Sequence, residues 1–202
     1  MSKIFIIMGK SATGKDTIFK RLLENKELDL KSVTGYTTRP IRSGETNGVE
    51  YYFVSEERLN NLRDDNKVIE LRTYPTMHGL WSYFTVNDGQ MDLVNSNYLF
   101  IGTLESYEQI KNYYGADVVV PIYIEVEDGL RLKRALHRER KQEHPKYKEL
   151  CRRFLADEED FSEENLKKLD IRKRYQNADI NICLYEIIQD VKSIIHQNDF
   201  TV

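Results

Sequence analysis

Nine residues near the N-terminus, "GKSATGKDT" (9–17), have the spacing of a phosphate-binding loop, G-x-x-x-x-G-K. Backbone N–H groups of such a loop surround phosphate oxygens, and Lys15 would reach the terminal phosphates of a nucleoside triphosphate. The next residue is usually Ser or Thr, which holds magnesium, but here it is Asp16, with Thr17 one residue later. The alternative is a tight strand-to-helix turn that uses its two glycines only for backbone freedom.

A second group of polar residues lies within "SVTGYTTRPIRSGETNGVEYYFV" (32–54). Arg39 and Arg42 are three residues apart in a loop, so both can direct a guanidinium group at one phosphate, and the Tyr51 hydroxyl can donate as well. Further along, Glu70 can accept two N–H groups from one edge of a base. Guanine has such a pair in N1–H and its 2-amino group, and adenine does not. Surface salt bridges for the arginines and a solvated carboxylate for Glu70 stay open as alternatives.

The elements around the loop are those that a phosphate site requires. The apolar run "KIFIIMG" (3–9) predicts a buried parallel strand, and residues 17–26 have apolar residues at a helical period. Further strands are predicted at 97–102, 118–126 and 178–183, and further helices at 104–115, 128–142 and 184–197. Strands alternating with helices predict a three-layer α/β fold with a parallel sheet.

Two segments interrupt this alternation. Residues 33–90 are rich in Thr, Tyr, Gly and Asn and contain short alternating runs, which predicts a small mixed β insertion. Residues 138–170 are highly charged and predict a solvated helical pair. The expected core therefore comprises residues 1–32, 91–137 and 171–202.

Composition narrows the class of protein. A net charge of −3, with 40% hydrophobic and 31% charged residues, gives no basic excess of the kind that nucleic-acid-binding domains have. No apolar stretch approaches the roughly 20 residues that span a bilayer. The two cysteines lie far apart and form no C-x-x-C motif, which favours a reduced setting. We expect a cytoplasmic monomer or homodimer that binds neither nucleic acid nor membrane.

Taken together, these segments resemble guanylate kinases. The loop of that family reads G-P-S-G-x-G-K-[SG]-T, and its next motif, S-V-S-x-T-T-R-x-P-R-x-G-E-x-N-G-x-D-Y-x-F-V, is similar to residues 32–54. A later F-I-E is similar to residues 68–70, and the [VI]-x-N-D-x-L before the last helix is similar to "INICL", which puts Asn181 at the family's asparagine. The resemblance implies a P-loop NTPase fold that phosphorylates GMP to GDP with ATP and Mg²⁺. In that fold residues 33–90 would be the GMP-binding insertion and residues 138–170 a helical lid.

The resemblance also implies roles for individual residues. Catalytic residues would be Lys15, Arg134, Arg138 and Arg153. ATP would be bound by Gly9, Ser11, Ala12, Thr13, Gly14, Lys15, Asp16, Thr17 and Asn181. GMP would be bound by Thr34 (or Gly35), Arg39, Arg42, Tyr51, Glu70, Trp81 and Ser82, and magnesium by Asp16 and Thr17.

The chain departs from the family pattern at three places. Asp16 replaces Ser or Gly, and Trp81-Ser82-Tyr83 stands where the family has Tyr-Gly-[ST]. In "FIGTLES" (100–106), Gly102 and Leu104 replace the two acids of a D-x-D motif. Asp16 can supply the missing magnesium-facing carboxylate, or it can simply gain roughly 0.3–1 kcal/mol from the helix dipole in the first turn of a helix.

These departures leave two other functions open. A guanylate-kinase-like binding or interaction module would bind nucleotide and turn it over weakly. A kinase for a different monophosphate would keep the phosphate loop, because the altered segments at 81–83 and 102–104 both border the expected acceptor pocket.

Overall fold

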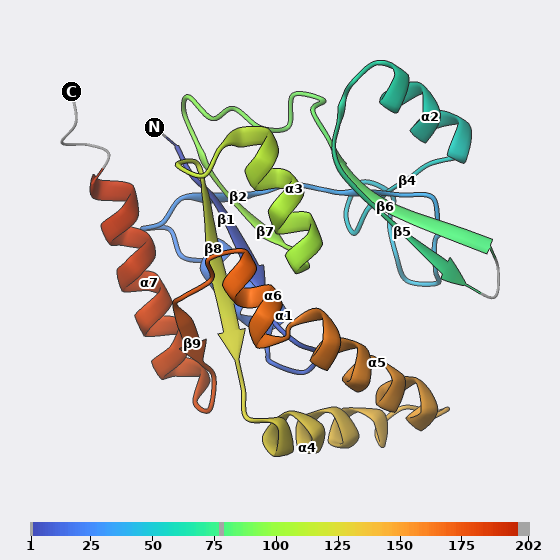
Figure 1. The fold of residues 1–202 in the computed structure, drawn as a ribbon, viewed down its shortest axis with the longest axis vertical. Helices are drawn as coiled ribbons and strands as arrows, with labels where there is room; N and C mark the ends of the chain where they lie inside the picture. Colours follow the sequence, from blue (N-terminus) through green and yellow to red (C-terminus); the bar gives the residue numbers. More distant parts are fainter. Residues whose placement is uncertain (1, 77–78, 198–202) are drawn as a thin grey trace.

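The computed structural model describes residues 2–76 and 79–197. Residues 1, 77–78 and 198–202, which belong to the predicted core and insertion, lie outside the described part. Within it the chain forms a five-stranded and a four-stranded sheet with helices around them (Figure 1).

The larger sheet is parallel, as predicted. Its strand order is β2-β7-β1-β8-β9. The strands are β1 (Ile4–Met8), β2 (Leu30–Ser32), β7 (Asn97–Ile101), β8 (Val119–Glu125) and β9 (Arg174–Gln176). The strands predicted at 3–9, 97–102 and 118–126 are confirmed.

The predicted strand at 178–183 is wrong. The fifth strand, β9, ends before this segment, and α7 (Ile180–Gln197) begins within it. The Asp179 carboxylate accepts hydrogen bonds from the backbone N–H groups of Asn181 and Ile182, at 2.8 and 3.2 Å. This cap satisfies amides that a helix start leaves unpaired, so it favours the helix over the strand that the alternating isoleucines suggest.

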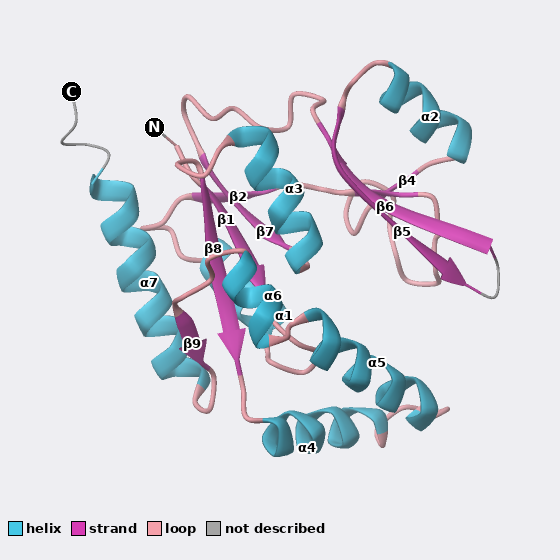
Figure 2. Cartoon of the chain, in the orientation of Figure 1, coloured by secondary structure: helices cyan, strands magenta, loops and turns pink. Residues whose placement is uncertain are grey.

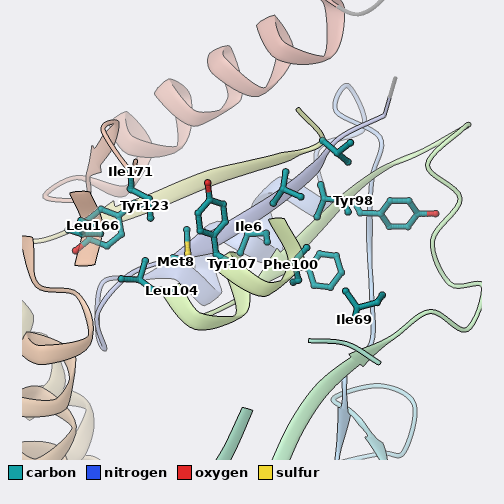
Figure 3. Close-up of a cluster of buried hydrophobic side chains, with 14 of the residues drawn as sticks. Ile6, Met8, Ile69, Tyr98, Phe100, Leu104, Tyr107, Tyr123, Leu166 and Ile171 are labelled. Carbon is teal, nitrogen blue, oxygen red and sulfur yellow. The ribbon is translucent and has the colours of Figure 1, made fainter. Parts of the chain in front are cut away.

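Helices cover both faces of the parallel sheet, which gives the three layers (Figure 2). They are α1 (Lys15–Leu23), α3 (Leu104–Tyr114), α6 (Glu163–Lys168) and α7. The side chains of β1 alternate: Phe5 and Ile7 join the cluster with α1 and α7, while Ile4, Ile6 and Met8 join the cluster with α3 and α6 (Figure 3). Because β1 is buried on both faces, the C-terminal end of this strand is a rigid support for the loop that follows.

The insertion forms the second sheet, in the order β4-β3-β6-β5. Its elements are β3 (Tyr36–Thr37), β4 (Tyr52–Phe53), α2 (Glu56–Asp64), β5 (Val68–Thr76) and β6 (Gly79–Val86). The β3–β4 pair is parallel and the other pairs are antiparallel, so the sheet is mixed. Ile69 reaches the core cluster (Figure 3), and the Gln109 side chain on α3 bonds both backbone groups of Leu71. The insertion is therefore fixed to α3 through β5.

The charged segment, residues 138–170, contains α5 (Tyr147–Asp160) and α6. The preceding helix, α4 (Asp128–Glu139), ends just inside it. Arg131 on α4 is 1% exposed, stacks on the Phe154 ring at 4.0 Å and pairs with Asp128, Asp157 and Glu158. α4 and α5 are thus joined by a buried cation. The prediction of a solvated pair misses this, and it also misses Leu166 of α6, which is buried in the core. In the part of the chain that the structure covers, no helix has the length and apolarity to span a membrane.

Candidate nucleotide site

The phosphate-loop candidate connects β1 to α1, as predicted. Gly14 has a positive φ of 90° and caps α1. A Cβ at Gly9 would lie 2.5 Å from the Ile124 carbonyl oxygen, and one at Gly14 would lie 2.6 Å from Asn177 Nδ2. The two glycines are therefore needed for close approach of β8 and of the segment after β9, as well as for backbone freedom.

Lys15 begins α1 and turns back into the loop, where Nζ donates to the Lys10 carbonyl oxygen at 3.3 Å. Burial lowers the pKa of Lys15, and Asp16 and Asp157 offset part of this shift. The positive charge of Arg138 lowers the pKa further. A partly desolvated ammonium group beside a helix N-terminus is suited to bind a polyphosphate. The negative charge of the polyphosphate would stabilise the charged form of the ammonium group.

Asp16 and Thr17 are exposed in the first turn of α1. Mg²⁺ is usually held by one or two protein oxygens together with substrate phosphates. In keeping with that pattern, no group of three His, Cys, Asp or Glu side chains suited to a metal occurs among residues 2–76 and 79–197. One carboxylate and one hydroxyl at this helix start fit a Mg²⁺ that arrives with the nucleotide, so Asp16 and Thr17 stay predictions as its ligands.

Two acidic side chains of α5 form hydrogen bonds with the first residues of the loop. Asp157 Oδ2 accepts the backbone N–H of Ser11 at 2.8 Å, and Glu158 Oε2 accepts Lys10 Nζ at 2.6 Å. Both carboxylates also pair with Arg131. Sequence reasoning missed this contact because the acids lie in a charged run that is typical of a solvated helix.

The predicted lid arginines divide into two roles. Arg138 and Arg153 line one cavity together with Ser11, between α4 and α5. Arg153 also pairs with Glu149, at 3.2 Å. Arg134 instead donates through Nη2 to the carbonyl oxygen of Asn177 at 2.9 Å. The structure therefore brings Arg138 and Arg153 towards the loop, while Arg134 binds the segment that follows β9.

The asparagine at the loop is Asn177, and Asn181 lies elsewhere. Asn177 is 2% exposed, and its Nδ2 donates to the Thr13 carbonyl oxygen at 2.7 Å. Its Oδ1 has no hydrogen-bond partner within the described residues. Asn181 is exposed on α7 and accepts from Arg21 Nη1 at 3.0 Å. The prediction for Asn181 came from placing the last strand too late; an asparagine directly after β9 was the better signal.

On the insertion, β5 and β6 present one polar face. The register pairs Glu70 with Thr85, and Arg72 with Tyr83. Glu70 is 2% exposed and accepts from Thr85 Oγ1 at 2.9 Å, from Arg72 Nε at 2.9 Å and from Arg72 Nη2 at 3.3 Å. Glu70 is therefore a buried, hydrogen-bonded carboxylate, and the alternative of a solvated side chain is wrong.

A single cleft of about 400 Å³ joins the loop to this face. Its lining includes Lys15, Thr34, Tyr51, Glu70, Arg72 and Thr85. The size is within the range of roughly 300–1,000 Å³ that is typical of small-molecule sites. The cleft thus places the loop lysine and the predicted base-reading carboxylate on one cavity, although they are far apart in sequence.

Trp81 and Ser82 do not line this cleft, whereas Thr85 does. Ser82 points to the opposite face of the hairpin, where its Oγ lies 2.9 Å from Thr73 Oγ1. Trp81 is paired with Tyr74, four residue pairs along the hairpin from the Glu70–Thr85 pair. Of these three residues of β6, only Thr85 is therefore on the cleft, and the predicted positions 81 and 82 are not. A partial signal was present, because Tyr83-Phe84-Thr85 has the tyrosine and threonine of the family's Tyr-Gly-[ST], with Phe84 in place of the glycine.

The predicted phosphate-binding arginines differ in environment. Arg39 is 4% exposed, pairs with both Glu45 oxygens at 2.8 and 2.6 Å, and lies over the Tyr51 ring at 5.5 Å. Hydrogen bonding from Arg39 lowers the pKa of Glu45 to about 2. Arg42 is exposed, and its backbone N–H donates to the same carboxylate at 2.8 Å. Arg39 and Tyr51 are thus brought together, while Arg42 lies at the outer edge.

The missing acids of the D-x-D motif have a structural basis. A Cβ at Gly102 would lie 2.4 Å from Ser106 Oγ. That oxygen is committed to a capping box with Thr103 at the start of α3, with bonds of 2.8 and 3.2 Å. Leu104, at the second position, is 7% exposed and packs in the core. The chain has therefore replaced carboxylates with a packed helix start at this wall of the cleft.

The sequence and the fold are similar to those of guanylate kinases. A family model described as "Guanylate kinase" matches residues 1–163. Guanylate kinase from Porphyromonas gingivalis is 33% identical over 126 residues, which cover 61% of this chain and 65% of that protein. Guanylate kinase from Malacoplasma penetrans is 34% identical over 140 residues, 68% of this chain and 58% of that protein.

The length matched varies among these relatives. Less than two thirds of the P. gingivalis and M. penetrans proteins is matched, whereas the match to Mycoplasma mobile guanylate kinase, at 28% identity over 208 residues, covers 96% of this chain and 92% of that protein. The crystal structure of guanylate kinase from Anaplasma phagocytophilum has the same fold, with a TM-score of 0.62 and 20% identity over 95% of this chain and 85% of that chain.

Proposed function

The chain belongs to the guanylate kinase family, and from this premise we propose that it transfers the γ-phosphoryl group of ATP to GMP, giving ADP and GDP. The observation that carries the proposal is the single cleft lined by both Lys15 and Glu70. A lysine suited to polyphosphate and a carboxylate suited to guanine on one cavity allow donor and acceptor to meet.

On the donor side, the amides of the loop and Lys15 would bind the ATP phosphates. Mg²⁺ would neutralise charge on the phosphate oxygens, with Thr17 or Asp16 as the protein ligand. Arg138 and Arg153, which share a cavity with Ser11, would stabilise charge on the transferring group from the lid. Asn177, whose buried Oδ1 has no hydrogen-bond partner among the described residues, is a candidate contact to the rest of ATP.

On the acceptor side, Glu70 and Thr85 would read the guanine edge. Tyr51 and Arg39 would hold the GMP phosphate, with Arg42 joining from the outer edge. This arrangement needs no covalent intermediate, because phosphoryl transfer depends mainly on alignment and charge neutralisation. Closure of α4 and α5 would exclude water, which would otherwise accept the phosphoryl group.

A coupled assay with ATP, Mg²⁺ and each of GMP, dGMP, AMP, CMP and UMP tests the proposal. We expect turnover with GMP and at most weak turnover with the pyrimidine and adenine monophosphates. GMP binding without turnover would support a binding module instead. Preference for another monophosphate would overturn the assignment of Glu70 as a guanine reader.

A further inference from the structure

Glu70 is already occupied by another side chain of the same face. Arg72 donates Nε–H to Oε2 at 2.9 Å and Nη2–H to Oε1 at 3.3 Å, so one edge of its guanidinium group engages both carboxylate oxygens. Thr85 Oγ1 adds a third bond, to Oε1 at 2.9 Å. Arg72 itself lines the cleft, with 17% of its side chain exposed.

The chemistry of this pair matches the chemistry expected of the base. Two parallel N–H groups on neighbouring nitrogens of one guanidinium carbon form a fork that a carboxylate accepts in bidentate fashion. The N1–H and 2-amino groups of guanine are also two parallel N–H donors attached to one carbon, because that part of the purine is a cyclic guanidine. Arg72 therefore presents to Glu70 the same donor pair that GMP would present.

Glu70 cannot accept the donor pair of Arg72 and the donor pair of guanine at the same time. Each carboxylate oxygen has two lone-pair sites. Oε1 uses both sites, for Thr85 and Arg72, and Oε2 uses one, for Arg72. One site is left, whereas a bidentate guanine needs one on each oxygen.

We propose that Arg72 is an internal substitute for the guanine edge, which GMP must displace from Glu70 in order to bind. This inference rests on the proposed function, and it adds a residue that sets acceptor affinity. With the pocket empty, Arg72 keeps a buried carboxylate paired, which avoids the large cost of an uncompensated buried charge. On binding, guanine restores two hydrogen bonds to Glu70, and only the Arg72 side chain has to move.

The consequence is a lowered affinity for the correct acceptor alone. GMP binds only the fraction of molecules in which Glu70 is free, so its apparent dissociation constant is raised by that fraction. AMP has no donor pair for Glu70 and would leave the Arg72 pair in place. IMP, with N1–H but no 2-amino group, needs only the one site that remains on Oε2.

The test is the variant Arg72→Met, which keeps the aliphatic stem and removes the guanidinium group. Arg63→Met, at an exposed position near the end of α2, is the matched control. Titration calorimetry should show GMP binding roughly tenfold tighter than in the wild type, since charged hydrogen bonds have this strength. Affinities for AMP and IMP should be unchanged, as should all affinities of Arg63→Met.

Unchanged or weaker GMP binding by Arg72→Met would overturn the inference, because it would show that Arg72 supports the base or is indifferent to it. If this variant does not fold, arginine Nε–H NMR signals of the wild type serve instead, with the Arg72 signal assigned through Arg72→Lys. GMP should shift that signal and AMP should not; a signal that GMP leaves in place would also overturn the inference. A wild type that turns over GMP while either result is negative keeps the proposed function, whereas a wild type that neither binds nor phosphorylates GMP overturns both.

Discussion

The two ends of the cleft are each held by the protein's own charged side chains, but the partners come from different distances along the chain. At the loop, Ser11 and Lys10 bond to Asp157 and Glu158, which are 146 and 148 residues away. At the acceptor face, Glu70 bonds to Arg72, two residues away on the same strand.

This difference indicates two kinds of opening. Asp157, which binds the loop amide, also pairs with buried Arg131, the residue that joins α4 and α5, so we expect freeing of that amide to involve movement of both helices. Freeing Glu70 requires one side chain to change rotamer. Movements of whole helices belong to the μs–ms range and exposed rotamer changes to the ps–ns range. We therefore expect ATP binding to be coupled to lid motion and GMP binding to be a local exchange.

The largest effect should come from Lys15→Met, which removes the cation at the donor end. We expect kcat/KM for ATP to fall about 10³-fold, because loss of one preorganised charge at the transferring group costs roughly this much. GMP affinity by calorimetry should be unchanged, and Lys20→Met, exposed on α1, should be neutral. A parallel loss of GMP affinity would show that the two ends of the cleft are not separable.

Glu70→Gln should have the next largest effect, at the acceptor end. The amide presents one donor and one acceptor, so it cannot accept both N–H groups of guanine. We expect KM for GMP to rise about 100-fold, since a site with mismatched buried polar groups discriminates strongly, and KM for ATP to stay within about twofold. Glu56→Gln, exposed on α2, is the control. GMP affinity that is untouched by Glu70→Gln would remove Glu70 from the acceptor site.

Asp157→Asn addresses the contact between α5 and the loop. The neutral amide keeps the shape but weakens the bond to the Ser11 N–H, so the loop should be free in a larger fraction of molecules. We expect KM for ATP to fall about fivefold, with KM for GMP unchanged. Glu159→Gln, the exposed neighbour, should change neither constant. If KM for ATP rises instead, Asp157 supports ATP rather than competing with it.

The smallest of the expected effects is in the pH dependence of kcat/KM for ATP, which should change little near neutral pH. Burial lowers the pKa of Lys15 below its ordinary value of 10.5. Lys15 is charged below that pKa and neutral above it, so ATP binding should weaken as pH rises, at lower pH than an ordinary lysine would cause. Lys15→Arg should move this alkaline decline to higher pH. The same decline in Lys15→Arg would show that another group titrates.

Several features of the site follow from local sequence and could be predicted. Alternating apolar strands and helices give the three-layer fold, and the glycine and lysine spacing of 9–15 lies between β1 and α1 as predicted. Glu70 lies on the cleft with Tyr51 as predicted. These predictions depend on residues close together in sequence, whose periodicity and backbone requirements can be read directly.

Other features depend on strand register, which the sequence leaves open. A shift in the β5–β6 pairing between Val68 and Glu70 places Glu70 opposite Thr85. Val68 joins the cluster beneath α2 with Phe84, while Glu70 faces the cleft. Period-2 alternation would put Val68 and Glu70 on the same face, and one residue of slip exchanges the faces. The predictions for Trp81 and Ser82 came from the family's Tyr-Gly-[ST] motif, whereas the pairing of the two strands places Thr85 opposite Glu70.

The sequence by itself determined a phosphate loop between a strand and a helix, a parallel α/β core and a carboxylate suited to guanine. Tertiary structure decided which groups those residues meet. Asn177 reaches Thr13 and Asp157 reaches Ser11 only because β9 pairs with β8 and α5 folds back to the loop after β1. Likewise, Arg72 engages Glu70 because strand alternation puts both on the face of the hairpin that lines the cleft. Local spacing fixes the chemistry that a residue can offer, whereas pairing and packing over long separations fix its partner.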